Sequence, residues 1–142
     1  MQNYFLELKN LHKSYQDGSG IHHILKGAEL HSEQGETIAI LGNSGSGKST
    51  LLNLIAGIDL PDQGEVLIQG KSLGQLSEKK RTLLRRKKMG FVFQSFNLIP
   101  TLNVEENLML PLEMNGIPNN SGIIPQMLGG LNLQGREESY PD

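Results

Sequence analysis

The stretch Thr37–Thr50 reads TIAILGNSGSGKST and joins patterns that together indicate one fold class. Residues 37–41 form a short apolar run rich in β-branched residues, which is typical of a strand buried on both faces of a parallel sheet. Residues 42–49 satisfy the pattern G-x-x-x-x-G-K-[ST] in full. The leucines and isoleucine that follow recur at helical spacing up to Ile55. A strand, a glycine-rich loop and a helix in this order predict an α/β fold with a P-loop NTPase core.

The chemistry of this loop favours phosphate binding. Its glycines let successive backbone N–H groups turn toward one anion, and the helix that follows adds the partial positive charge of its N-terminus. Lys48 is expected to reach the β- and γ-phosphates of a nucleotide, and the Ser49 hydroxyl to ligate Mg²⁺. The predicted nucleotide-binding residues of the loop are Gly42, Asn43, Ser44, Gly45, Ser46, Gly47, Lys48, Ser49 and Thr50.

Two other kinds of loop compete with phosphate binding as an interpretation of this pattern. The first is a glycine-rich turn between a strand and a helix that happens to carry an exposed lysine. The second is a Rossmann dinucleotide site, which fits worse because Thr50 stands where the third glycine of G-x-G-x-x-G belongs.

Composition excludes several classes of site. The 142 residues carry a formal net charge of −2, so a dominant basic footprint for nucleic acid is not expected. The chain has no cysteine and 4 histidines without metal-ligand spacing, which excludes disulfides and disfavours a zinc centre. No apolar run approaches the roughly 18 residues of a membrane helix, and the first residues lack the pattern of a signal peptide. The composition predicts a soluble intracellular protein.

Weaker patterns outline the rest of the chain. Basic residues crowd into 79–88, where a solvated helix face is favoured over a nucleic-acid or anionic-lipid patch, with Leu83 and Leu84 expected to point inward. Asn103 is expected to cap a helix that Pro111 would end or kink. The predicted strands are 5–8, 24–30, 37–41, 65–68 and 90–94, and the predicted helices are 49–56, 77–87, one that starts after Asn103, and a short one near 123–133.

Two segments carry a family resemblance. HHILKGAELHSEQGETIAILGNSGSGKSTLLNLIAGIDLPDQGEV and GFVFQSFNLIPTLNVEENLMLPL resemble the ATP-binding subunit of ABC transporters, most closely the branch that serves lipoprotein release and macrolide-type export. The resemblance implies ATP and Mg²⁺ as cofactors and an RecA-like P-loop core with an N-terminal antiparallel β subdomain. It divides the chain into residues 1–94, with the β subdomain and P-loop core, and 95–142, with the Q-loop and the start of an α-helical subdomain.

The resemblance also implies two site residues outside the loop. Tyr15 falls on the aromatic A-loop residue that stacks on adenine, although an aromatic packed at a strand end would look the same. Gln94 falls on the Q-loop glutamine, which can offer its side-chain oxygen to Mg²⁺ or to the attacking water. The implied catalytic residues are therefore Lys48 and Gln94, and the implied magnesium ligands are Ser49 and Gln94.

Several motifs of the family are not found in this sequence. The LSGGQ signature, the Walker B Asp–Glu pair and the switch histidine are absent, and neither MLGG at 127–130 nor IAGID at 55–59 replaces them. The chain resembles the N-terminal part of such a subunit, so residues 38–41 are expected to have an unpaired apolar edge. We expect weak Mg-ATP binding without hydrolysis at a family-like rate, because no general base can be named.

The implied partners are a transmembrane permease subunit and a second ATP-binding subunit, as a homodimer or heterodimer, with no nucleic acid. The implied location is cytoplasmic and peripheral, at the inner face of the cell membrane. One alternative is a non-catalytic nucleotide-binding fragment or regulator that pairs with a complete subunit. A P-loop GTPase or small-molecule kinase is a weaker alternative, because the chain has no N-K-x-D guanine reader.

Overall fold

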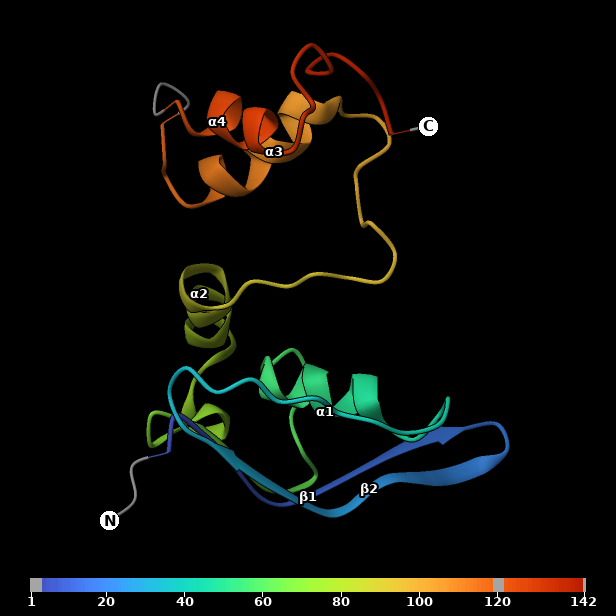
Figure 1. Cartoon of the computed structure of the whole chain (residues 1–142). Helices are drawn as coiled ribbons and strands as arrows, with labels where there is room; N and C mark the ends of the chain where they lie inside the picture. The colour runs from blue at the N-terminus through green and yellow to red at the C-terminus, as the bar shows by residue number, and fades with distance from the viewer. Residues whose placement is uncertain (1–3, 119–121, 142) are drawn as a thin grey trace. The chain divides into compact units, whose positions relative to one another are not determined.

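The computed structural model describes residues 4–118 and 122–141 (Figure 1). The chain divides into two compact units, Met1–Met89 and Gly90–Asp142. The elements of the first unit are β1 Leu6–Asp17, β2 Gly20–Ser32, α1 Lys48–Ile55, β3 Gln63–Ile68, β4 Lys71–Ser72, the 3₁₀ turn η1 Leu73–Gln75 and α2 Glu78–Lys88. Those of the second unit are α3 Val104–Met114 and α4 Ile123–Gly130.

The sheet of the first unit is antiparallel, as expected for the N-terminal part of the chain. Its four strands lie in the order β2-β1-β3-β4. β1 extends to Asp17, well beyond the predicted strand at 5–8, and pairs with β2 along its length. The pairing shifts register between Leu8 and Leu11, where Asn10 adopts a positive φ of 47°. Such a bulge breaks the alternation of apolar and polar residues, which is why the sequence predicted only the first part of the strand.

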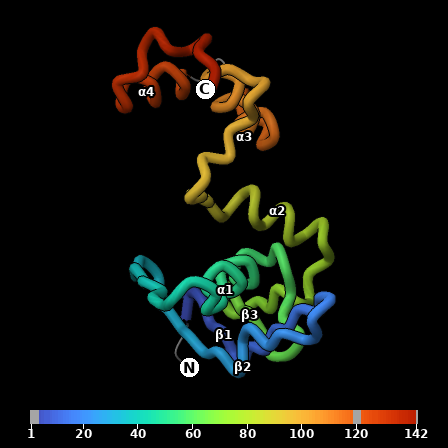
Figure 2. The backbone as a smooth tube through the Cα atoms, turned by 90° about the vertical axis from the view of Figure 1, so that its right-hand side faces the viewer, coloured from blue at the N-terminus to red at the C-terminus, as the bar shows by residue number. Residues whose placement is uncertain are grey.

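Helix α1 closes the core of this unit by packing on the sheet (Figure 2). Leu54 of α1 is fully buried and joins apolar side chains from β1, β3 and η1. Burying one leucine completely contributes roughly 1.5–3 kcal/mol, so this small cluster supplies much of the unit's stability. The fully or almost fully buried members of the cluster are Leu8, Leu11, Leu54, Val66 and Leu73.

Two predicted strands are not strands in this structure. Residues 37–41 and 90–94 have no strand assignment, and neither segment pairs with another among the described residues. Leu41 is 90% exposed and Val92 is fully exposed. An isolated extended segment gains no ladder hydrogen bonds, since these come only from a neighbouring strand. The segment 37–41 therefore has the composition of a buried strand, but no described strand pairs with it.

Helix α2 carries the basic run, and its two inner arginines share one acidic partner. Arg81 and Arg85 both donate to the Glu78 carboxylate, with shortest N–O distances of 2.6 Å and 2.9 Å. Leu84 packs against the core as expected, but Leu83 is 40% exposed, so its predicted inward position is wrong. A helix with basic residues on most sides has only a narrow apolar face, and Leu84 occupies it. The exposed basic residues are Lys79, Lys80, Arg86, Lys87 and Lys88.

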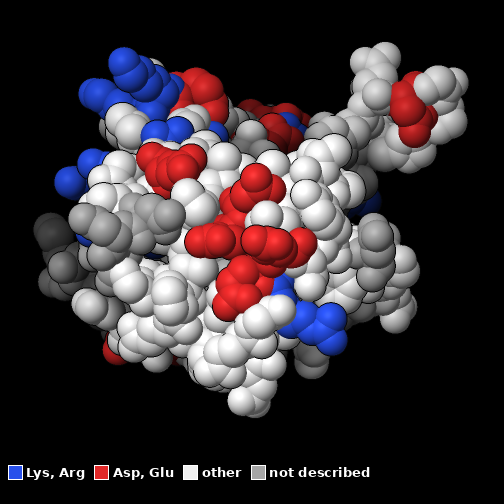
Figure 3. Space-filling view, turned by 90° about the horizontal axis from the view of Figure 1, so that it is seen from above, with Lys and Arg blue, Asp and Glu red and all other residues white. Residues whose placement is uncertain are grey.

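Asp and Glu side chains gather near the middle of the face drawn in Figure 3.

The Glu78 cluster predicts a pH-dependent contribution to stability. Hydrogen bonds from Arg85 and Arg81 lower the pKa of Glu78 from 4.5 to about 2. Because the folded-state pKa lies below the unfolded value, this contribution is fully present above about pH 4.5 and is lost as the pH falls through about 2. Glu78→Gln should therefore lower the thermal midpoint slightly at pH 7, and the difference from wild type should vanish near pH 2. The effect is small because the carboxylate is exposed.

A matched control for this variant is Glu29→Gln. Glu29 is exposed on β2 and forms no ion pair in the part of the chain that the structure describes. Thermal unfolding followed by circular dichroism at a series of pH values compares the two variants. An equal response of both variants at pH 7 would contradict a specific role of Glu78.

In the second unit, α3 begins with a full capping box. The Asn103 side chain accepts from the Glu106 N–H at 2.8 Å, and the Glu106 carboxylate accepts from the Asn103 N–H at 2.9 Å, which confirms the predicted cap. Pro111 lies inside the helix, which continues to Met114, so of the two predicted effects of this proline the helix end is wrong and the kink stays a prediction. One proline removes a single backbone donor, and the flanking hydrogen bonds carry the helix past it.

Helix α4 occupies the first part of the predicted segment 123–133. It ends at Gly130, and its buried residues are Ile124 and Leu128. Pro125 falls in the first turn, where a missing N–H costs no intrahelical hydrogen bond.

Candidate nucleotide-binding site

The glycine-rich loop leads directly into α1, and its glycines are required by the backbone. Gly45 and Gly47 have φ values of 78° and 88°, a region that favours glycine. Gly47 is also the N-cap of α1 and lies directly against β2, because a Cβ there would come within 2.8 Å of Ile24 Cγ2. The backbone conformation and the lack of space beside Ile24 therefore both favour glycine at position 47, where the loop enters the helix.

Lys48 folds back over the loop from the first position of α1. Its Nζ donates to the carbonyl oxygens of Gly42 at 2.8 Å and Asn43 at 2.7 Å, and lies 3.4 Å from Ser46 Oγ. The loop is itself closed by a turn in which the Ser46 N–H donates to the Asn43 carbonyl at 3.2 Å. Lys48 forms no ion pair with a carboxylate among the described residues, so its positive charge is held at the loop without being neutralised.

The N-terminus of α1 has the electrostatic character of an anion site. No side chain caps it, and its first turn has no acidic residue. The first backbone N–H groups of a helix have no intrahelical partner, and together they carry about half a positive charge. Ser49 is exposed on this turn and Thr50 is half-buried. The arrangement fits a group that brings several negative oxygens.

This geometry fits phosphate better than it fits a metal held by protein ligands alone. Among residues 4–118 and 122–141, no cluster of three or more His, Cys, Asp or Glu could hold a metal ion. The Ser49 hydroxyl is a neutral oxygen ligand, and Mg²⁺ commonly combines one or two protein ligands with phosphate oxygens and water. The residues at the loop therefore fit Mg²⁺ as a companion of a bound phosphate group.

Tyr15 lies near the C-terminal end of β1, close to the phosphate loop. The residue is 42% exposed, and its hydroxyl donates to Asp59 Oδ2 at 2.9 Å. Burial, followed by the hydrogen bond to Asp59 and its negative charge, raises the pKa of Tyr15, while a hydrogen bond with Thr50 and the charge of Lys13 oppose this rise. Because Thr50 belongs to the first turn of α1, the structure brings the predicted aromatic residue and the predicted phosphate loop together.

Gln94 belongs to the second unit. It is exposed in a segment without helix or strand, between the stacked rings of Phe91 and Phe93 on one side and Ser95 on the other. Its predicted contact with Mg²⁺ or water stays a prediction.

Sequence reasoning missed Asp59 and Lys13, which contact Tyr15. Asp59 ends the IAGID segment, and the leucine that follows it stands where the glutamate of a Walker B pair belongs, so no motif points to this residue. Lys13 showed no signal, because one lysine among the polar residues of β1 looks like any solvated side chain. Its side chain is in fact buried, with an exposure of 8% for the residue.

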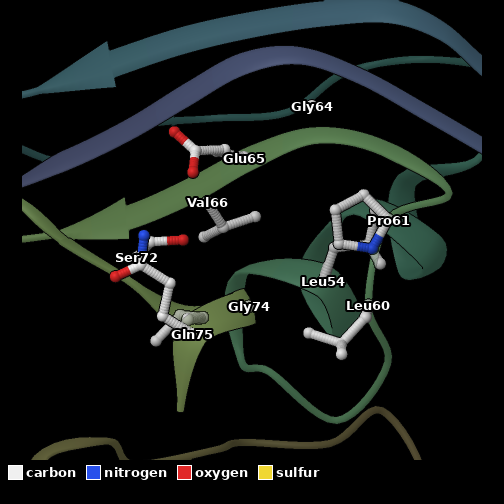
Figure 4. Close-up of a pocket in the computed structure, with 10 residues that line it drawn as sticks. Leu54, Leu60, Pro61, Gly64, Glu65, Val66, Ser72, Gly74 and Gln75 are labelled. Atoms are coloured by element: carbon white, nitrogen blue, oxygen red, sulfur yellow. The ribbon is translucent and has the colours of Figure 1, made fainter.

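A separate pocket of about 140 Å³ lies between α1, β3 and η1 (Figure 4). Leu54, Leu60, Val66 and Leu73 contribute its apolar lining, and Glu65 is the only charged residue at its edge. The pocket contains no residue of the phosphate loop, and we assign it no part in the candidate site.

The comparisons with known proteins identify the family of the chain. The family described as ABC transporter matches residues 25–141. An uncharacterised ABC transporter ATP-binding protein of Mycobacterium tuberculosis is 43% identical over 139 residues, covering 96% of this chain and 56% of that protein. The lipoprotein-releasing system ATP-binding protein LolD of Paramagnetospirillum magneticum is 39% identical, covering 99% of this chain and 63% of that protein. The second match agrees with the branch that the resemblance indicated.

A solved structure of an ATP-binding cassette has a similar fold. The dimeric ATP-binding cassette MJ0796, in a post-hydrolysis state bound to ADP and Pi, has a TM-score of 0.82 and 39% sequence identity, covering 96% of this chain and 61% of that chain. This neighbour confirms the predicted P-loop NTPase fold class. The chain spans about half to two thirds of the length of the relatives that it matches. No helix in the described part of the chain is long and apolar enough to cross a membrane. The chain belongs to the ABC transporter family of ATP-binding proteins.

Proposed function

We propose that this chain binds Mg-ATP through the loop at 42–49, as the nucleotide-binding part of a transporter's ATP-binding subunit. The observation that carries the proposal is the uncapped N-terminus of α1, with the unneutralised Lys48 ammonium folded over it. The names of the relatives and the ADP and Pi in the solved neighbour support ATP as the nucleotide. Tyr15, beside Thr50, would stack on the base.

Each residue of the site has a chemical task in this proposal. The loop's backbone N–H groups and Lys48 hold the triphosphate and offset its negative charge. Ser49 would supply an oxygen ligand to the metal that accompanies the triphosphate. The role of Gln94 as a second oxygen ligand rests on the family resemblance alone. Mg²⁺, when bound, would supply positive charge that offsets the negative charge of the phosphates. Among the described residues no carboxylate contacts the Lys48 ammonium, so we assign the loop to binding and positioning and name no general base from it.

The proposed partners are a transmembrane permease subunit and a second ATP-binding subunit. The solved neighbour is a dimer, and the relative LolD is named as part of a lipoprotein-releasing system, so both lines support an assembly. In such an assembly the chain would lie at the inner face of the cell membrane. Co-purification with a membrane protein and ATP-dependent dimerisation would support this role over that of a regulator that only binds nucleotide.

Titration with a fluorescent ATP analogue tests the binding proposal. The full chain with Mg²⁺ should bind the analogue saturably, and ATP should compete for the same site. GTP should compete as well, because stacking on an aromatic ring reads no edge of the base. A strict preference for GTP would overturn the assignment in favour of a GTPase. No saturable binding at millimolar nucleotide would overturn phosphate-loop function altogether.

A further inference from the structure

A buried lysine joins β1 to the turn that follows α1. Lys13 Nζ donates to Asp59 Oδ1 and to the Leu60 carbonyl, both at 2.8 Å, and lies 3.7 Å from Asp62 Oδ1. The side chain is largely removed from solvent, so these oxygens replace the water that an ammonium group requires. The hydrogen bonds hold the Asp59 carboxylate in one orientation.

The second oxygen of the same carboxylate holds Tyr15. Asp59 Oδ1 accepts from Lys13 while Asp59 Oδ2 accepts from the Tyr15 hydroxyl at 2.9 Å. Lys13 Nζ also lies 5.2 Å from the centre of the Tyr15 ring, within the range of a cation–π contact. The tyrosine is therefore fixed at its hydroxyl and covered on one face, while the ring remains partly exposed.

We propose that Asp59 is a positioning residue for the base of the bound nucleotide, with Lys13 as its support. Asp59 sets the plane of the Tyr15 ring before the nucleotide arrives, and Lys13 leaves the base only the opposite face. The inference rests on the proposed function, because it assumes that Tyr15 receives the base. A partly exposed ring without this anchor would have to be immobilised during binding, which weakens affinity.

Tyr15→Phe is the cleanest test, because it keeps the ring and removes only the hydroxyl that Asp59 holds. We expect the affinity for ATP to fall roughly three- to tenfold, the usual cost of fixing one side chain on binding. Inorganic tripolyphosphate, which has no base, should bind the variant and the wild type equally. Asp59→Ala should show the same loss for ATP, and Asp59→Asn, which keeps an oxygen acceptor, should restore part of it.

The experiment is isothermal titration of the full chain with ATP and, separately, with tripolyphosphate. Tyr140→Phe is the matched control, because Tyr140 is an exposed tyrosine of the second unit and its change should alter neither affinity. Combining Tyr15→Phe with Asp59→Ala should cost no more than either change alone, since both break the same hydrogen bond.

The possible outcomes separate the inference from the proposed function. If wild type binds both ligands and Tyr15→Phe binds ATP as tightly as wild type, the positioning role is overturned and the phosphate loop stands. If Tyr15→Phe loses tripolyphosphate and ATP equally, the hydroxyl supports the loop in general, and the positioning role is again overturned. If wild type binds neither ligand, the proposed function fails and the inference fails with it.

Discussion

Replacing Lys48 with alanine is expected to weaken the binding of ATP by roughly 10- to 100-fold, because hydrogen bonds to a charged group contribute about 1.5–3 kcal/mol. The lysine is the only cation bonded to the loop carbonyls of Gly42 and Asn43 in the described part of the chain. Tripolyphosphate should lose affinity as well, since the lysine acts on phosphate and not on the base. Titration of the full chain with both ligands measures the effect.

The control for this variant is Lys71→Ala. Lys71 is exposed on β4 and makes no ion pair among the described residues, so its loss removes the same formal charge from the protein. Long-range attraction alone would make the two variants alike. Equal affinities of the Lys48 and Lys71 variants would contradict the assignment of Lys48 to the phosphates.

Gly64→Ala is expected to destabilise the first unit by roughly 2–4 kcal/mol, the sum of an unfavourable backbone conformation and overpacking. Gly64 has a φ of 88°, and an added Cβ would collide with the backbone carbonyl oxygens of Lys9 and Asn10 on β1. Backbone atoms cannot move aside as the tip of a side chain can. Relief would require β3 to separate from β1 near the bulge.

Gly70→Ala separates the two contributions to this cost. Gly70 has a φ of 73°, but a Cβ there meets nothing within 4 Å, so only the backbone conformation is penalised. We expect a loss of about 1–2 kcal/mol for Gly70→Ala, clearly less than for Gly64→Ala. Urea unfolding of the two variants compares them directly. A Gly64 variant no less stable than the Gly70 variant would show that the strands adjust freely.

Local patterns predicted helix α1 and the cap of α3 well. The phosphate loop, α1 and the Asn103–Glu106 cap are all determined by residues within a few positions of one another, so their signals lie together in the sequence. The φ of Gly47 favours glycine, and the pattern G-x-x-x-x-G-K-[ST] has glycine at the same position.

Features that depend on distant residues were predicted poorly. Thr37–Leu41 has the composition of a buried strand, but composition does not supply a pairing partner, and the segment lies unpaired. The hydrogen bond between Lys13 and Asp59 joins residues 46 positions apart, and no pattern in the sequence around either residue predicts it. Leu83 and Leu84 both interrupt the basic run of α2, but only Leu84 packs against the core.

Gly47 of the loop lies close against Ile24 of the hairpin, with no room for a Cβ between them. Ile24 belongs to β2, which is paired along its length with β1, and β1 carries Tyr15. The hairpin thus determines the distance between the Tyr15 ring and the first turn of α1. A ligand that spans this distance with a base at one end and phosphates at the other would be selected by its length, whatever the identity of the base.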